Sequence, residues 1–392
     1  LAGGMPGGMP PGGFPGGSGQ TGGRAGANGM GQVSRNRGTE FLVPEYQLFD
    51  AGVFVVGKKS MGKLDLGGGL RADARNERTD DLFLDENGAK SPGPGPEITQ
   101  KFVGFHQKFG GISGSLGATY QFSKKIYGKM NLSRGFRAPN IAELGANGVH
   151  EGTIRYEIGD PNLAPETSWE GDLALGIRSE HVTAEFDLFD NRIENFIFSK
   201  KLATTEGRDS ILEGLRAFKF VSGKANLLGG EFSLDLHPHP LDWLHFENAF
   251  SWVDAVQLGQ PDSTRFLPFT PGPKLSTELR ADLKKWGKNI ENGYFWVRLD
   301  QYFAQNRVFS AFGTETKTPG YRLLEVGLGA DFSRKNRKIC SVFVSANNLT
   351  DVAYQSHLSR LKYAPENFAT GRTGVFEMGR NFSFKLLVPL VF

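Results

Sequence analysis

The feature that most constrains the fold of this chain is a period of two in its apolar residues. From residue 64 to residue 75, apolar or small residues alternate with charged residues or glycine. The same alternation recurs around residues 126–133, 172–177, 182–188 and 324–331. Successive side chains of a strand point to opposite faces, so each run predicts a strand with one apolar and one polar face. No convincing helical period accompanies them, and the sequence predicts an all-β fold.

The connections between these runs alternate in length. Short connections are predicted near residues 59–62, 123–125, 179–181, 237–242, 284–290 and 333–338. Long connections are predicted near residues 77–110, 135–166, 199–215, 256–268, 304–319 and 351–375. In an antiparallel up-and-down sheet this rhythm places all long loops at one end, which is the layout of a transmembrane β-barrel. The rhythm predicts about fourteen strands, with the first two near residues 24–36 and 47–58.

Composition agrees with a membrane barrel and excludes several other classes. The net charge is +3, from 45 basic and 42 acidic residues, so the chain lacks the basic excess of a nucleic-acid-binding protein. No stretch approaches the roughly 20 apolar residues of a membrane helix. The mean hydropathy of −0.33 still suits a barrel, because barrel strands are short and half polar. The single Cys340 excludes an internal disulfide framework.

The beginning of the chain differs from the rest. Residues 1–30 contain 13 glycines and 4 prolines, and such a segment buries too little apolar surface to offset the entropy of ordering it. We expect residues 1–30 to be a flexible Gly/Pro/Met-rich segment and residues 31–392 to form the barrel. The chain begins with Leu and shows no signal peptide, which favours a truncated record of a longer protein.

Four short motifs lie in a fixed order along the chain. Residues 136–139 read Phe-Arg-Ala-Pro, residues 160–163 read Asp-Pro-Asn-Leu, and residues 348–351 read Asn-Leu-Thr-Asp. The chain ends on an alternating strand with Phe392. This series resembles the C-terminal half of TonB-dependent outer-membrane transporters, in which the second motif normally begins with Asn. The resemblance covers residues 30 to 392.

The resemblance implies the fold and the partners of a nutrient receptor. It implies a 22-stranded barrel in the cell outer membrane, of which this chain would supply the last fourteen strands. A plug domain, absent from this chain, would gate the lumen and receive energy from the TonB complex. Phe392 would be the signal for the outer-membrane barrel assembly machinery. The expected ligand is a ferric siderophore or a similar metal chelate, bound without a cofactor or covalent chemistry.

Candidate ligand-binding residues lie in the loop between the first two motifs. They are Arg137, His150, Glu151, Arg155, Tyr156, Glu157 and Asp160. Arg137 could bind an anionic ligand or pair with a carboxylate of the barrel wall. Haem receptors of the family carry a haem-ligating histidine between similar motifs, which makes His150 a candidate axial ligand; the alternative is a hydrogen bond within the loop.

Other sites and other functions are weaker hypotheses. The sequence contains no phosphate-binding loop, zinc-protease motif or nucleophile elbow, so we expect neither catalytic nor metal residues. We interpret His237-Pro238-His239 as a proline turn beside an interfacial Trp243 rather than as a metal site. Besides siderophore uptake, the open alternatives are a haem receptor, a passive porin or adhesin barrel, and a soluble glycan-binding β-protein.

Overall fold

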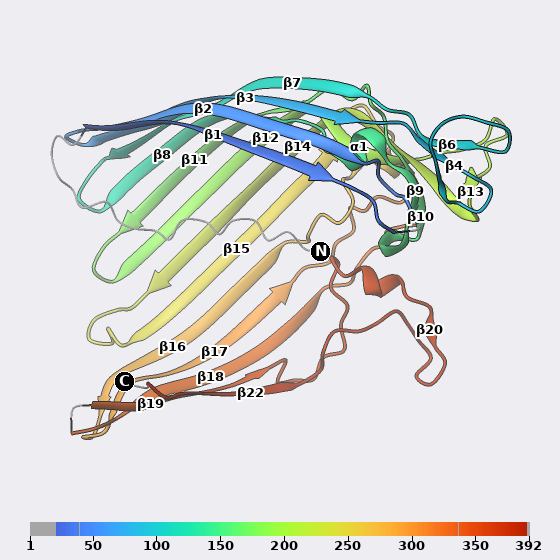
Figure 1. Ribbon diagram of the computed structural model, residues 1–392. Helices are drawn as coiled ribbons and strands as arrows, with labels where there is room; N and C mark the ends of the chain where they lie inside the picture. The colour runs from blue at the N-terminus through green and yellow to red at the C-terminus, as the bar shows by residue number, and fades with distance from the viewer. Residues whose placement is uncertain (1–20, 39, 336, 390–392) are drawn as a thin grey trace.

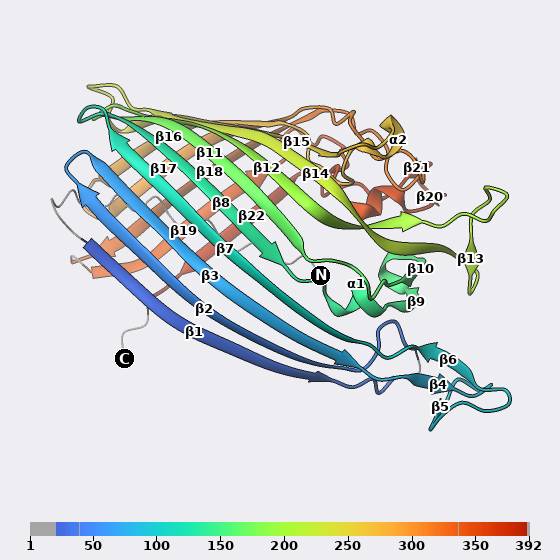
Figure 2. The same ribbon diagram turned by 90° about the horizontal axis from the view of Figure 1, so that it is seen from above.

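Fourteen long strands form one curved antiparallel sheet that resembles an open trough (Figures 1 and 2). The computed structural model describes residues 21–38, 40–335 and 337–389. Each long strand pairs with the next long strand along the chain. The long strands are β1 (Thr21–Ser34), β2 (Tyr46–Met61), β3 (Leu64–Thr79), β7 (His106–Gln121), β8 (Ile126–Arg137), β11 (Glu166–Arg178), β12 (Val182–Lys201), β14 (Leu215–Leu236), β15 (Leu244–Gln257), β16 (Lys274–Trp286), β17 (Ile290–Tyr302), β18 (Tyr321–Arg334), β19 (Arg337–Asn347) and β22 (Asn381–Leu387).

The remaining elements are short and belong to the connections. The short strands are β4 (Leu82–Leu84), β5 (Lys90–Ser91), β6 (Thr99–Phe102), β9 (Asn147–His150), β10 (Arg155–Ile158), β13 (Ile211–Leu212), β20 (Glu366–Asn367) and β21 (Arg372–Thr373). The helices are α1 (Ile141–Gly145), α2 (Asp262–Arg265), η1 (Glu151–Thr153) and η2 (Arg360–Tyr363). Among the described residues, no helix is long and apolar enough to cross a membrane.

The predicted rhythm of connections is confirmed. The elements α1, β4, β6, β9, β10, β13 and β20 gather at one end of the sheet, which we call the loop end (Figure 1). The tight turns near residues 62, 123, 180, 240 and 288 lie at the opposite end, which we call the turn end. One pairing departs from the antiparallel neighbour pattern, because the loop strand β10 runs parallel to β14.

The outer face of the sheet is apolar and exposed. Leu70, Leu116 and Leu173 expose 62%, 67% and 63% of their surface, and all three belong to the apolar series of their strands. Exposed aromatic residues lie toward both ends of this face, including Trp169 near the loop end and Trp286 near the turn end. An apolar band flanked by aromatic girdles is the surface that a transmembrane barrel presents to lipid.

The inner face combines charged residues, glycines and aromatic rings. A Cβ at Gly176 would lie 2.2 Å from the ring of Tyr127, and one at Gly327 would lie 2.5 Å from the indole of Trp296. At these positions the missing side chain leaves room for a ring from the adjacent strand, which is a common partner for a strand glycine. The wall itself therefore fills the space above these glycines.

The predicted boundary at residue 30 is wrong. Residues 21–30 form the first part of β1 and pair in register with β2, from Thr21 opposite Lys59 to Met30 opposite Asp50. A glycine-rich segment can pair here because the backbone supplies the ladder, while the neighbouring strand supplies the side chains. Residues 1–20 and Phe392 lie outside the described residues. Within the described part, β1 pairs with β2 alone and β22 pairs with β19 alone.

Candidate functional site

A small apolar core lies at the loop end beneath the segment that carries the predicted site. Leu144 of α1 is 1% exposed and packs with Phe109, Leu163 and Ile197. These residues come from β7, β12 and the loop between β8 and β11. Burial of apolar side chains therefore fixes this loop against the inner side of the sheet.

Helix α1 is held by its first turn. The Asn140 side chain accepts hydrogen bonds from the backbone N–H groups of Ala142 and Glu143, at 2.9 and 3.0 Å. The Glu143 carboxylate in turn accepts the backbone N–H of Asn140 at 2.8 Å. This reciprocal capping box satisfies donors that a five-residue helix would otherwise leave unpaired. It also aims the Glu143 carboxylate at the end of β8.

Arg137 at the end of β8 joins α1 to the beginning of β11. Its guanidinium donates to Glu143 at 2.9 Å and, through Nε, to Glu166 at 2.6 Å. The second oxygen of Glu166 accepts the backbone N–H of Ile197 in β12 at 2.7 Å. The two carboxylates are only 11% and 13% exposed, whereas the Arg137 side chain is 43% exposed. Arg137 thus pairs with carboxylates, as one hypothesis from the sequence proposed, and still presents an accessible edge.

A second group of charges lies next to this arginine. Arg75 of β3 donates two hydrogen bonds of 2.8 Å to Asp50 of β2 and one of 3.5 Å to the carbonyl of Pro139. Glu77 is fully buried, and its two carboxylate oxygens have no hydrogen-bond partner within the described part of the chain. These residues were not predicted, although their alternate spacing in β2 and β3 places them on the polar face.

The hairpin of β9 and β10 brings three predicted residues together. His150 Nδ1 lies 3.0 Å from Glu157 Oε1, and the Arg155 guanidinium lies 2.7 Å from the same oxygen. Register places Arg155 directly opposite His150. Glu157 is 4% exposed and His150 is 42% exposed, so a buried carboxylate orients an accessible imidazole. Arg155 also lies over the ring of Phe218 in β14, at 5.1 Å.

The other three predicted residues have separate surroundings. Tyr156 is buried and donates to Asn147 Oδ1 at 2.9 Å. Glu151 lies in η1 and is exposed. Asp160 pairs with Lys219 of β14 at 3.0 Å. Partial burial alone raises the pKa of Asp160, but the Asn162 backbone N–H and Lys219 outweigh it and hold the pKa below its usual value.

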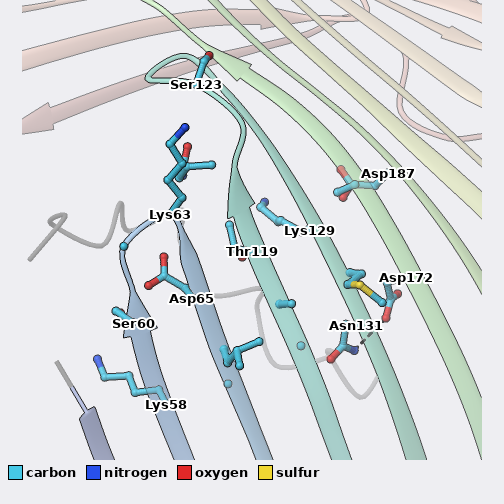
Figure 3. A pocket seen from close by; sticks show the side chains of 18 of the residues that line it. Lys58, Ser60, Lys63, Asp65, Thr119, Ser123, Lys129, Asn131, Asp172 and Asp187 are labelled. Atoms are coloured by element: carbon cyan, nitrogen blue, oxygen red, sulfur yellow. Dashed lines mark hydrogen bonds between the residues drawn. The ribbon is translucent and has the colours of Figure 1, made fainter. Parts of the chain in front are cut away.

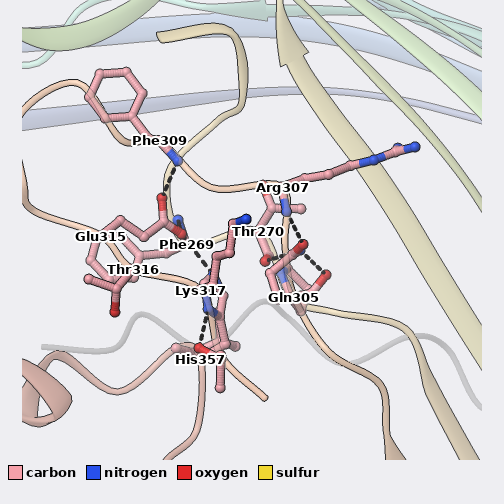
Figure 4. A network of polar contacts seen from close by, with 12 residues as sticks. Phe269, Thr270, Gln305, Arg307, Phe309, Glu315, Thr316, Lys317 and His357 are labelled. Atoms are coloured by element: carbon pink, nitrogen blue, oxygen red, sulfur yellow. Dashed lines mark hydrogen bonds and ion pairs between the residues drawn. The ribbon is translucent and has the colours of Figure 1, made fainter. Parts of the chain in front are cut away.

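The loop end also contains a buried polar network that the sequence did not reveal (Figure 4). The side chain of Glu315 is 0% exposed and accepts the backbone N–H groups of Phe269 and Phe309, at 3.0 and 2.8 Å. It also contacts His357 Nε2 at 2.7 Å. In the same view, Gln305 donates to the Thr270 carbonyl at 2.9 Å. The network joins the loops 258–273, 303–320 and 348–380.

Lys362 extends this network from the third loop. Its Nζ donates to the carbonyls of Thr316 and Lys317, at 2.9 and 3.0 Å, and to the Thr318 hydroxyl at 2.7 Å. The Thr318 hydroxyl lies 2.8 Å from His357 Nδ1. Since Lys362 can only donate, the Thr318 O–H is free to donate to a neutral His357 whose Nε2–H is directed at Glu315. Burial lowers the pKa of Lys362, and Glu315 acts in the opposite direction.

The third motif closes the base of the same loop. Asn348 is 3% exposed, and its side-chain amide exchanges two hydrogen bonds of 2.9 Å with the backbone of Val352. The Asp351 carboxylate accepts the backbone N–H of Arg380 at 2.9 Å, just before β22 begins. Asn348 and Asp351 both have positive φ, a conformation that Asn and Asp tolerate better than most residues. The motif therefore builds the turn between β19 and the last loop.

A hollow lies on the inner face at the turn end, far from the predicted ligand loop (Figure 3). Its volume is about 1210 Å³. Among the side chains that line it are Lys58, Lys63, Asp65, Lys129, Asn131, Asp172 and Asp187. Asn131 donates to Asp172 at 3.0 Å, and Lys129 pairs with Glu185 at 2.6 Å. Charged side chains of both signs therefore line the hollow.

The curved sheet, its apolar outer band and its two unequal ends define a membrane β-barrel architecture. The family model "TonB dependent receptor-like, beta-barrel" matches residues 12–349. The chain therefore belongs to the TonB-dependent receptor family through its barrel.

Solved structures of receptors and transporters share this fold. The copper transporter OprC is 16% identical with a TM-score of 0.66, over 88% of this chain and 50% of that chain. The FrpB iron transporter from Neisseria meningitidis is 13% identical with a TM-score of 0.64, over 94% and 52%. The Serratia marcescens hemophore receptor HasR, in complex with its hemophore HasA and heme, is 15% identical with a TM-score of 0.61, over 94% and 58%. The chain thus spans about half the length of the structures it matches.

Proposed function

We propose that this chain forms the barrel wall and loops of a receptor that imports a metal chelate across the cell outer membrane. The cargo class we favour is a ferric siderophore. Uptake draws energy through TonB, acting on a plug domain in the lumen of the barrel. The apolar outer face contacts lipid, and the barrel assembly machinery inserts the protein. Membership of the TonB-dependent receptor family supports this proposal.

The single observation that carries the choice of ligand is the presence of accessible, oriented hydrogen-bond donors at the loop end. Arg137 and His150 remain 43% and 42% exposed although buried carboxylates orient them. Such donors suit an anionic chelate, because a charge-assisted hydrogen bond is about twice as strong as a neutral one. The matched structures support this class of ligand, since they include a copper transporter, an iron transporter and a ferric-catecholate import receptor.

The charge distribution on the inner wall favours a receptor over a charge-selective pore. Many of its charges are paired, some of them across neighbouring strands, as in Arg75 with Asp50 at 2.8 Å and Lys274 with Asp300 at 2.8 Å. Paired opposite charges leave little net field along the wall, whereas a selective pore concentrates charge of one sign. We therefore assign ligand choice to the loops.

The test uses the full-length protein in cells that lack other iron receptors. The probes are ⁵⁵Fe(III) complexes of a catecholate, a hydroxamate and citrate, with and without TonB and with and without a protonophore. We expect at least one complex to bind the cell surface under all conditions but to accumulate only with TonB and a proton-motive force. Accumulation that is equal without TonB would contradict the proposal and favour a passive channel. Recovery of the protein in the soluble fraction would favour a glycan-binding β-protein.

Haem is the second candidate cargo, and one observation favours it. Glu157 holds Nδ1 of His150, so Nε2 is the nitrogen left to bind iron. A carboxylate behind the imidazole is a common arrangement for a metal-ligating histidine. Haem titration of the full-length protein, followed by absorption spectroscopy, separates the two cargoes. A low-spin Soret band that disappears in His150→Ala would select haem.

A further inference from the structure

Imidazoles are concentrated at the turn end, remote from the ligand loops. Four of the seven histidines lie in or beside two neighbouring turns, those of residues 179–181 and 237–243. They are His181, His237, His239 and His245. The rings of His237 and His245 have centroids 4.9 Å apart, and His181 lies 6.1 Å from His237. The carboxylate of Asp235 lies between His237 and His245.

We propose that Asp235, His237 and His245 form a binding site for one divalent transition-metal ion, with Zn(II) as the reference ion. Asp235 ends the polar series of β14, His237 begins the turn, and His245 lies at the start of β15. One ligand atom from each residue lies within 4.8 Å of the other two. Two imidazoles and one carboxylate form a donor set of catalytic zinc and other open metal sites.

The separations of both imidazole nitrogens from Asp235 match those around a tetrahedral ion. His237 Nδ1 lies 3.4 Å and His245 Nδ1 lies 3.2 Å from the same oxygen, Oδ2 of Asp235. Zinc bonds of about 2.05 Å at a tetrahedral angle place two ligand atoms roughly 3.3 Å apart. An ion between these atoms therefore requires little movement of Asp235. A fourth position remains for water.

The hydrogen bonds of His237 support a cation at this position. Its Nε2 donates to the Glu180 carbonyl at 2.5 Å, and its backbone N–H donates to the His181 carbonyl at 3.0 Å. Its Nδ1 is buried and has no hydrogen-bond partner among the described residues. When Nε2 carries the proton of a neutral imidazole, Nδ1 presents a lone pair toward the Asp235 carboxylate. A metal ion satisfies both groups, and a carbonyl behind the ligating histidine is typical of metal sites.

The surroundings of His245 agree with a cation at this position. Its Nε2 lies 3.9 Å from Asp282, so a carboxylate stands behind the second imidazole as well. Glu247 lies opposite Asp235 in register and adds another negative charge. Arg280 lies opposite His245 but pairs with Asp282 at 2.9 Å. The three ligands are 20% to 32% exposed, so an ion can enter from the solvent at the turn end.

Binding of the metal alone tests the site. The untagged full-length protein in detergent is titrated with Zn(II) against a competing fluorescent chelator, and Co(II) absorption reports the coordination geometry. We expect one ion per chain and a tetrahedral Co(II) spectrum. His237→Ala, His245→Ala and the isosteric Asp235→Asn should each weaken Zn(II) binding by at least about tenfold. The control His106→Ala removes a histidine whose partner is Asn76 at the loop end, and it should bind as wild type does.

Two results would overturn the site. One is wild-type Zn(II) binding no tighter than that of the Asp235→Asn/His237→Ala/His245→Ala variant. The other is a loss of binding in His106→Ala equal to the loss in His237→Ala. Heat-dependent gel mobility verifies that each variant is a folded barrel. Zn(II) should raise the unfolding temperature of the wild type and leave that of folded Asp235→Asn unchanged. If the histidine variants fail to fold, Asp235→Asn therefore tests the metal site by itself.

Discussion

Replacement of Glu315 by Gln tests whether one buried carboxylate holds three loops together. Glu315 accepts hydrogen bonds from Phe269 N–H, Phe309 N–H and His357, at 3.0, 2.8 and 2.7 Å. Glutamine has the same shape but carries one oxygen acceptor and one NH₂ donor. Whichever way the amide is turned, its NH₂ group faces a backbone N–H. Because a backbone N–H cannot change its role, one hydrogen bond is lost in either orientation.

The expected cost follows from the burial of this group. Losing a hydrogen bond to a charged group costs about 1.5–3 kcal/mol, and leaving a buried N–H unsatisfied adds about 1–3 kcal/mol. Because the two terms overlap, we expect Glu315→Gln to lower the free energy of opening the three loops by about 3 kcal/mol. At 1.4 kcal/mol per factor of ten, opening of the three loops should become roughly 100-fold more frequent. The sheet beneath should keep its stability, since the carboxylate contacts only the loops.

Hydrogen exchange measured by mass spectrometry provides the assay. Peptides from residues 303–320 and 348–380 of Glu315→Gln should exchange roughly 100-fold faster, while peptides from β16 and β17 exchange as in the wild type. The control Glu366→Gln makes the same charge change at an exposed position of the last loop. Exchange of the Glu315→Gln loops within about threefold of both other proteins would refute the assignment of Glu315 as the loop anchor.

Four further outcomes follow from the loop end and the chain terminus. Arg137→Lys keeps the charge, but an ammonium cannot bridge Glu143 and Glu166 as the planar guanidinium does. In the same exchange assay, the protection of residues 138–165 should therefore fall by about 1–2 kcal/mol. Protection equal to that of the wild type would contradict a bridging role for Arg137. His150→Ala should leave the haem spectrum featureless in mutant and wild type alike if the cargo is a siderophore; a wild-type Soret band lost in the mutant contradicts this. The pKa of Asp160 is lowered in the folded protein, so its ion pair with Lys219 should stabilise the loop at a pH above the usual aspartate pKa. This stabilisation should be lost as the pH falls through the pKa of Asp160 in the folded protein. When loop exchange is measured against pH, Asp160→Asn should lack that transition. Phe392→Ala should reduce the amount of protein in the membrane without lowering the temperature of heat-dependent gel mobility, whereas normal abundance with a lower temperature indicates a packing role.

The sequence alone determined the strands and the faces of the sheet. Period-two alternation is a local property, because the geometry of one strand decides which side chains share a face. For that reason Leu70 and Leu173 lie on the apolar face of their strands, and both are exposed. The lengths of the connections were equally informative, since a tight turn forces neighbouring strands to pair. The flexible segment was predicted to extend to residue 30, whereas β1 begins at Thr21, because a ladder partner, and not composition, decides here between coil and strand.

The tertiary structure decided which side chains meet. Arg137, predicted from a motif, pairs with Glu166 because β8 and β11 align residues 29 positions apart. Glu315 and His357 are 42 positions apart in loops without periodicity, so no spacing in the sequence indicates their contact. His237 reads as a proline turn in the sequence, and the register of β14 with β15 brings its ring beside His245 and Asp235. Alternation assigns a residue to a face of the sheet, whereas contact between loops depends on how the curved sheet brings the ends of its strands together.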